Sequence, residues 1–203
     1  MKKLLAALLA VATFGCGAKE SEYHGKTVSV WVQELDQGPP AGQAAAANLL
    51  TEVGKVDPSA LRSLTAGVKN GSFGAADVLG KIGTSAANGQ TKECVVALAE
   101  GMKMKGNARN SLRLACARAV PRFGKASKEA VPALLEMLRD EDPIMRAQAA
   151  KTLGQMPPEA AQEAVNALLL AARTDQAPDV QLSATEAIRA LDPAALEQPK
   201  GKP

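Results

Sequence analysis

One hydrophobic pattern occurs five times along this chain at nearly even spacing, and this periodicity strongly limits how the chain can fold. Each copy places apolar or small residues at the first, fourth, fifth and eighth positions of a short stretch. The copies begin at Val28, Leu61, Val95, Val131 and Val165, so successive starts are 33, 34, 36 and 34 residues apart. A period of this length is typical of stacked helix pairs that form a solenoid.

A second helix is predicted after each copy, from small residues followed by larger apolar residues on one helical face. In the third copy this face carries Cys116, Val120 and Phe123. Small side chains let neighbouring helices approach closely, as stacked pairs require. The predicted repeats cover residues 27–54, 58–83, 91–124, 127–157 and 158–192, and residues 193–203 are predicted to be a disordered tail.

The first residues have the pattern of an export signal. Lys2 and Lys3 precede an uncharged apolar run of 11 residues, 4–14, which is too short to span a bilayer as a helix. The stretch Ala-Thr-Phe-Gly-Cys at residues 12–16 resembles a bacterial lipobox. The resemblance implies that residues 1–15 are cleaved, that Cys16 carries the lipid, and that residues 16–26 form a flexible tether. The alternative is an ordinary secretory peptide, cleaved for example after Ala18.

Charge gives little support for nucleic-acid binding. The whole chain has 24 Lys and Arg against 21 Asp and Glu. Loss of Lys2 and Lys3 with the signal leaves 22 against 21, a net charge of +1. An exported chain that is nearly neutral is not expected to bind nucleic acid.

The fourth repeat carries a family resemblance. Residues 127–156 combine a Val-Pro-x-Leu-Leu first helix with a turn from Asp140 to Pro143 and with Arg146, four residues before the small-residue column. This segment resembles a bacterial HEAT repeat of the kind also found in phycobilin lyases. The resemblance implies an all-α fold, a right-handed α-solenoid of about five helix pairs. It also implies a polar ladder through Arg146 and Arg113, which occupies the same position in the third repeat.

Two cysteines remain after the signal, Cys94 and Cys116, both in the third repeat. Cys94 falls in a column of small residues, so one interpretation is a buried small side chain. The other interpretation is a disulfide, which an exported protein can keep if the two positions lie at similar heights.

A run of basic residues gives a candidate binding surface. Between residues 101 and 128 there are eight basic residues and no acid. Arg118 and Arg122 are expected on a second helix, on the face opposite Cys116, Val120 and Phe123, with Lys151 and Gln155 as counterparts in the next repeat. The resemblance to HEAT arrays implies that this face lines a concave groove. Asn48, Asp77 and Glu186 extend this column to the other repeats. The surface suits an acidic partner or anionic lipid headgroups, although a solvated basic face neutralised by Glu100, Glu129 and Glu136 is the alternative.

The sequence contains almost no pattern that is typical of a catalytic site. There is no phosphate-binding glycine loop, no metal-ligand spacing and no Ser-His-Asp set, since His24 is the one histidine. No enzymatic activity, cofactor or metal is predicted.

The sequence predicts a lipid-anchored scaffold or adaptor that binds a protein of the bacterial cell envelope. Its expected place is the cell membrane or the outer membrane, facing the periplasm or the exterior. One alternative is a structural envelope protein without a specific ligand. The other is a lyase-type protein that handles tetrapyrroles, which the shared repeat alone suggests.

Overall fold

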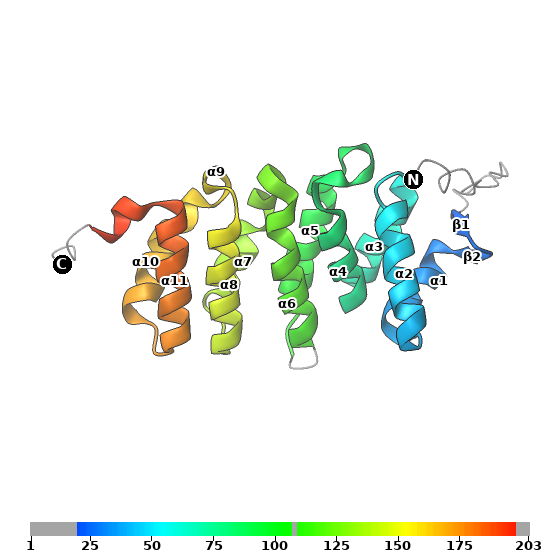
Figure 1. Ribbon diagram of the computed structural model, residues 1–203. Coiled ribbons are helices and arrows are strands. Elements are labelled where there is room, and N and C mark those ends of the chain that lie inside the picture. The colour runs from blue at the N-terminus through cyan, green and yellow to red at the C-terminus, as the bar shows by residue number, and fades with distance from the viewer. Residues whose placement is uncertain (1–19, 107–108, 198–203) are drawn as a thin grey trace.

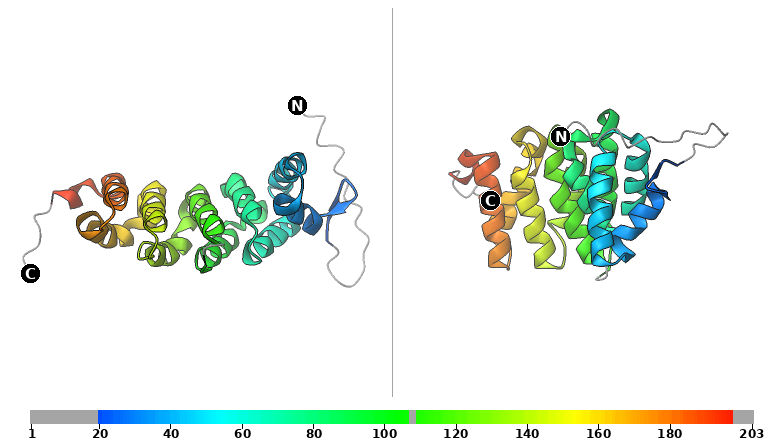
Figure 2. Two further views of the ribbon diagram at one scale, coloured as in Figure 1. Left: turned by 90° about the horizontal axis from the view of Figure 1, so that it is seen from below. Right: turned by 45° about the vertical axis from the view of Figure 1, so that its right-hand side comes forward.

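Stacked helix pairs form an elongated array with two layers (Figures 1 and 2). The computed structural model describes residues 20–106 and 109–197. Within them, the layer of first helices consists of α1 (Val28–Gln37), α3 (Pro58–Lys69), α5 (Thr91–Met102), α7 (Val131–Met137) and α10 (Val165–Thr174). The layer of second helices consists of α2 (Pro40–Val53), α4 (Phe73–Ile82), α6 (Asn110–Ala119), α8 (Pro143–Gln155) and α11 (Pro178–Leu191). The predicted all-α solenoid is confirmed.

The array has two long edges, which differ in their connections. At the intra-pair edge, the two helices of one pair are joined by short turns. At the inter-pair edge, successive pairs are joined by longer segments that contain short helices. These are η2 (Gly83–Ser85), η3 (Ala87–Gly89), η5 (Val120–Ala130), α9 (Pro158–Ala161) and η6 (Gln162–Ala164). The inter-pair edge is at the top of Figure 1, where α9 is labelled.

Aspartates begin several of the helices. The Asp57 carboxylate accepts a hydrogen bond of 2.8 Å from the amide of Ser59, and the Asp142 carboxylate accepts one of 2.9 Å from the amide of Ile144. A carboxylate at this position satisfies an amide that has no partner within the helix. Proline follows each aspartate, at a position where its missing N–H is not needed.

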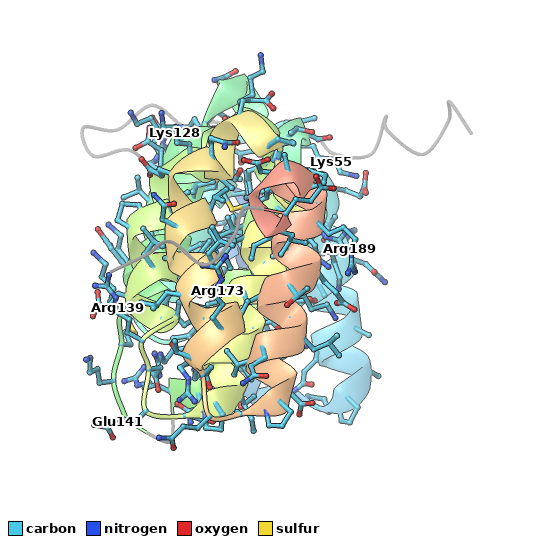
Figure 3. All side chains as sticks on the ribbon, turned by 90° about the vertical axis from the view of Figure 1, so that its left-hand side faces the viewer. Lys55, Lys128, Arg139, Glu141, Arg173 and Arg189 are labelled. Atoms are coloured by element: carbon cyan, nitrogen blue, oxygen red, sulfur yellow. The ribbon has the colours of Figure 1, made fainter. Side chains whose placement is uncertain are left out.

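Close contact between pairs depends on glycine in the second-helix layer. A Cβ atom added to Gly80 would lie 3.0 Å from the Cβ of Ala119, and one added to Gly154 would lie 2.6 Å from the Cα of Ala187. The equivalent position in the last pair is Arg189, which is exposed. Figure 3 views the array from its C-terminal end and places Arg189 on the side of the second helices.

The second pair is also closely packed, despite its many glycines. A Cβ atom on Gly67 would lie 2.8 Å from Val32, and one on Gly74 would lie 2.6 Å from the Cβ of Leu35. Glycine lowers the intrinsic stability of a helix by about 1 kcal/mol relative to alanine. Here it leaves room for the first pair to approach.

Residues 20–26, predicted as part of a flexible tether, are instead ordered against the first two pairs. Glu22–Tyr23 (β1) pairs antiparallel with Lys26–Thr27 (β2). His24 and Gly25 both have positive φ, 51° and 74°, which suits a two-residue hairpin turn. Tyr23 is buried, and its hydroxyl donates a hydrogen bond of 2.8 Å to Asp57. The hairpin is held because it covers apolar surface at the end of the array; residues 16–19 lie outside the described part.

The start of the predicted disordered tail is also ordered. Residues 193–196 form a short 3-10 helix, η7 (Pro193–Leu196), in which Ala195 is buried. Leu196 packs against the core, so apolar burial holds this segment in place. Residues 198–203 lie outside the described part of the chain.

Candidate binding surface

The predicted contact column runs along the layer of second helices. Each of the five second helices contributes one exposed residue: Asn48 on α2, Asp77 on α4, Arg118 on α6, Lys151 on α8 and Glu186 on α11. These helices lie next to one another in a single row (Figure 2, left). The structure therefore brings the five positions onto one layer.

The charges of this column are only partly neutralised. Asp77 forms an ion pair of 2.7 Å with Lys81 on its own helix. The guanidinium of Arg118 donates to the carbonyl of Leu114, also on its own helix, at 3.3 Å. Neither Arg118 nor Lys151 has an acidic partner in residues 20–106 and 109–197. These two cations are available to an external acid.

The sequence predicted that Arg122 lies on the same helix as Arg118, and this prediction is wrong. Helix α6 ends at Ala119, and Arg122 lies in η5, which runs along the inter-pair edge. Pro121 removes a backbone donor, and Gly124 turns the chain with φ of 56°. The two features end the α-helix early and carry Arg122 to the edge of the array.

A shallow cavity of about 340 Å³ lies between α8 and α11. It is lined by Pro143, Ile144, Ala147, Gln148, Lys151, Ala177, Asp179 and Ser183. The side chain of Ile144 is 63% exposed, and that of Leu182 on α11 is 59% exposed. The groove thus places the apolar side chain of Ile144 in the same lining as the cation of Lys151, and Leu182 is exposed elsewhere on α11. Sequence reasoning missed Ile144 and Leu182, whose one signal is an apolar residue outside the core columns.

The predicted ladder arginines form hydrogen bonds at the intra-pair edge. Arg113 is buried; it donates to the carbonyl of Met102 at 2.9 Å and forms an ion pair with Asp140 of the next repeat. Arg146 repeats this arrangement one pair later. Its guanidinium donates two hydrogen bonds of 2.8 Å to the two carboxylate oxygens of Asp175. Each arginine therefore links its own pair to the following pair.

These ion pairs change the acidity of their carboxylates. The hydrogen bond from Arg146 lowers the pKa of Asp175, and this effect outweighs burial, which raises it. Burial also raises the pKa of Asp140, but the hydrogen bonds from Arg113 and from the amide of Asp142 outweigh it and leave the pKa below its usual value. Both carboxylates thus remain charged for a structural role.

Of the two interpretations of Cys94 and Cys116, the structure shows buried small side chains and no disulfide: both thiols are free and buried. The sulfur of Cys116 lies 2.6 Å from where a Cβ atom on Gly101 would be, so it fills the space that Gly101 leaves. Gly101 is seven residues from Cys94 on α5, which is about 10 Å along a helix. The two positions are at different heights. Burial raises the pKa of each thiol to about 12.

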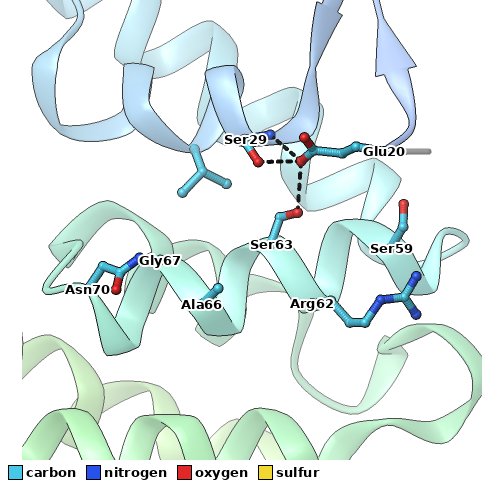
Figure 4. Close-up of a pocket in the computed structure, with 9 residues that line it drawn as sticks. Glu20, Ser29, Ser59, Arg62, Ser63, Ala66, Gly67 and Asn70 are labelled. Carbon is cyan, nitrogen blue, oxygen red and sulfur yellow. Dashed lines mark hydrogen bonds between the residues drawn. The ribbon is translucent and has the colours of Figure 1, made fainter. Parts of the chain in front are cut away.

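A second cavity, of about 430 Å³, lies at the N-terminal end between α1 and α3 (Figure 4). The carboxylate of Glu20 accepts hydrogen bonds from the amide of Ser29 at 2.6 Å and from the hydroxyl of Ser63 at 3.0 Å. Arg62 lies at the rim and is exposed. Glu20 belongs to the segment predicted as a tether, so sequence reasoning did not identify it.

Neither a metal centre nor a membrane-spanning helix is found in the described residues. No group of three or more His, Cys, Asp or Glu side chains there could hold a metal ion. None of the helices in that part is both long enough and apolar enough to cross a membrane. Cys16, the predicted lipid site, lies outside it.

The family model for HEAT repeats matches residues 96–189, which span most of α5 through most of α11. This part of the chain is similar to HEAT repeats. The match includes residues 127–156, which suggested the family in the sequence, and it includes both ladder arginines. HEAT repeats are in general protein-binding scaffolds without catalytic activity of their own.

One solved structure with a similar arrangement is described as "Crystal Structure of Engineered Protein. Northeast Structural Genomics Consortium Target OR329". Its TM-score is 0.47 at 20% sequence identity, over 84% of this chain and 82% of that chain. None of the curated proteins matches this chain.

Proposed function

We propose that this HEAT-repeat protein is a lipid-anchored adaptor of the bacterial cell envelope. In this proposal it binds a partner protein with an acidic surface through the second helices of its last three pairs. The repeats support a protein-binding role in general. The export signal and the lipobox-like stretch ending at Cys16 support the proposed location at a membrane of the cell envelope.

The observation that carries the proposal is the unpaired charge of Arg118 and Lys151 on an exposed helical layer. Lys151 lines the cavity between α8 and α11, and Ile144 and Leu182 are exposed on these same two helices. Partner interfaces commonly combine an apolar centre with charges that set orientation and specificity. The expected partner segment therefore has an acidic residue next to an apolar one.

The proposal is tested by crosslinking in intact cells, followed by purification of the full-length protein from membranes and mass spectrometry. The test variant is Arg118→Glu with Lys151→Glu, which reverses both cations of the surface. The matched control is Lys103→Glu with Arg139→Glu, two exposed residues outside the second helices. Figure 3 places Arg139 on the side opposite Arg189.

Loss of one envelope protein in the test variant alone would support the adaptor function and its surface. Identical crosslinks in the wild-type protein and both variants would contradict it and favour a structural role. A pigment or small molecule that remains bound in native mass spectrometry would instead favour a tetrapyrrole-handling protein.

A further inference from the structure

The chain enters its fold at the inter-pair edge. The hydroxyls of Ser21 and Ser59 are hydrogen-bonded at 3.0 Å, and the hydroxyl of Tyr23 donates to Asp57. Asp57 and Ser59 lie where the first pair connects to the second. Glu20 is fixed by the bonds to Ser29 and Ser63 shown in Figure 4. The first described residues are therefore held against this edge at the N-terminal end.

The connections along this edge lie side by side. The amide of Ala87, between the second and third pairs, donates to the carbonyl of Gly54, between the first and second pairs, at 3.1 Å. A Cβ atom on Gly83 would lie 2.7 Å from the carbonyl oxygen of Arg122, between the third and fourth pairs. A continuous surface thus leads from the hairpin to η5.

The charge of this surface is unevenly distributed. The hairpin and the starts of α3 and α5 carry the acids Glu20, Glu22, Asp57 and Glu93, whereas the η5 end is basic. Three of its lysines are neutralised by an acid: Lys55 by Glu52, Lys81 by Asp77 and Lys92 by Glu129. Arg122, Lys125 and Lys128, which we call the basic edge, are exposed. They have no acidic partner in the described ranges. In Figure 3, Lys128 and Lys55 lie at the top of the molecule and Glu141 lies at the bottom.

We propose that the basic edge lies against an anionic lipid surface. Clustered lysines and arginines are attracted to acidic headgroups over a distance of about 8 Å at physiological salt. The inference deepens the proposed function, because a lipid on Cys16 would hold this edge at the bilayer. Three residues separate Cys16 from the fixed Glu20, so the four Cα-to-Cα steps between them span at most about 14 Å.

The charge distribution also gives an orientation. Farther along the same edge, the connection between the fourth and fifth pairs carries the exposed acids Glu159 and Glu163. These repel an anionic surface, so the N-terminal half lies nearer to the bilayer than the C-terminal half. The groove between α8 and α11 then remains accessible to a protein.

The test measures which edge of the full-length protein lies near lipid. One thiol is introduced at either edge, by Ser85→Cys in η2 or Ser111→Cys at the start of α6, both of which are exposed. Cys94 and Cys116 are buried, with thiol pKa values of about 12, and the proposed lipid occupies the sulfur of Cys16, so a fluorophore labels the introduced thiol. Quenching by a nitroxide on the lipid headgroup is measured in phosphatidylcholine vesicles with and without 30% phosphatidylglycerol.

The variant Arg122→Glu, Lys125→Glu, Lys128→Glu removes the basic edge. The matched control, Lys103→Glu, Lys105→Glu, Arg139→Glu, reverses three exposed charges elsewhere. We expect stronger quenching at Ser85→Cys than at Ser111→Cys when phosphatidylglycerol is present. The basic-edge variant should lose this difference, while the control keeps it. Without the lipid anchor, the basic-edge variant should also bind such vesicles at least about tenfold more weakly than the control.

Equal quenching at the two edges, or quenching that does not depend on phosphatidylglycerol, would overturn the proposal. The intact mass of the purified chain distinguishes failure of the basic-edge proposal from failure of the proposed lipid anchor. A mass without lipid would refute the anchor at Cys16. Phosphatidylglycerol-dependent quenching of a chain with Cys16→Ser added to vesicles, in which the fluorophore again labels the introduced thiol, would still support the basic edge.

Discussion

Arg146 and Asp175 form a two-point ion pair across the boundary between the fourth and fifth helix pairs. Their side chains are 17% and 9% exposed, and both hydrogen bonds measure 2.8 Å. A third guanidinium nitrogen donates to the carbonyl of Asp140 at 2.8 Å. One side chain thus connects the turns of two repeats.

Removal of this arginine should destabilise the array. Arg146→Ala leaves the carboxylate of Asp175 without its partner, and we expect the free energy of unfolding to fall by about 3 kcal/mol. Urea denaturation followed by circular dichroism measures the change. Lys69→Ala is the control, because its pair with Glu100 is half exposed and contributes less than about 1 kcal/mol. Equal losses in the two variants would contradict this ranking.

The same pairs predict a characteristic loss of stability in acid. The pKa values of Asp140 and Asp175 are lowered in the folded chain from an ordinary value of 3.8. Their contribution is therefore complete above that value and is lost as the pH falls through the lower folded pKa values. Thermal melting between pH 6 and pH 2 should show this decline. A variant with Arg146→Gln should lose less stability over that range; an unchanged pH dependence would argue against the coupling.

Tyr23 predicts a loss of stability in alkali. Burial and the hydrogen bond to Asp57 raise the pKa of Tyr23 from 10.0 to about 12. Because the pKa is raised in the folded chain, the contribution of the Tyr23 hydroxyl to folding stability is complete below pH 10 and is lost as the pH rises toward 12. Tyr23→Phe should be less stable at pH 7 by about 1 kcal/mol, and less sensitive to alkali. Melting curves at pH 8 and pH 11 compare the two proteins, and parallel behaviour would show that the hydroxyl is not docked.

The state of the two buried cysteines can be counted directly. Folded protein at pH 8 should not react with a thiol reagent, because both thiols are buried with pKa values of about 12. Denaturation in urea without reductant should expose two reactive thiols. A count of zero in urea would reveal a disulfide between Cys94 and Cys116.

The close approach at Gly154 gives a packing test. Gly154→Ala places a Cβ atom 2.6 Å from the backbone of Ala187, so α8 and α11 must move apart. We expect a loss of about 1 to 3 kcal/mol in urea denaturation, despite the better helix propensity of alanine. Gln155→Ala, at an exposed neighbouring position, serves as the control and should change stability little. A Gly154→Ala variant as stable as this control would show that the contact is looser.

Periodicity was sufficient to predict the helix pairs, because these depend on local patterns repeated at fixed spacing. The ladder positions of Arg113 and Arg146 were predicted from the resemblance of residues 127–156 to a HEAT repeat. Positions that depend on the helix ends were predicted less well. Arg122 was placed on α6, but Pro121 and Gly124 end that helix early. The heights of Cys94 and Cys116 also depend on where α5 and α6 meet, which spacing in sequence does not specify.

The hairpin was missed for a different reason. Residues 20–26 are mostly polar and have no helical period, so the sequence predicts a flexible tether there. Their order comes from tertiary bonds, among them the one from Tyr23 to Asp57, 34 residues away. The groove between α8 and α11 was missed because a cavity depends on how far apart two helices pack.

The fourth pair has Gly154 where the fifth pair has Arg189, and this difference affects how another molecule could stack on the end of the array. A glycine lets the backbone of another pair come within contact distance, as Gly80 does for the third pair and Gly154 for the fifth. The bulky, charged side chain of Arg189 fills this position at the end of the described array and costs desolvation if it is covered. End-to-end polymerisation of separate molecules into fibres is thereby disfavoured.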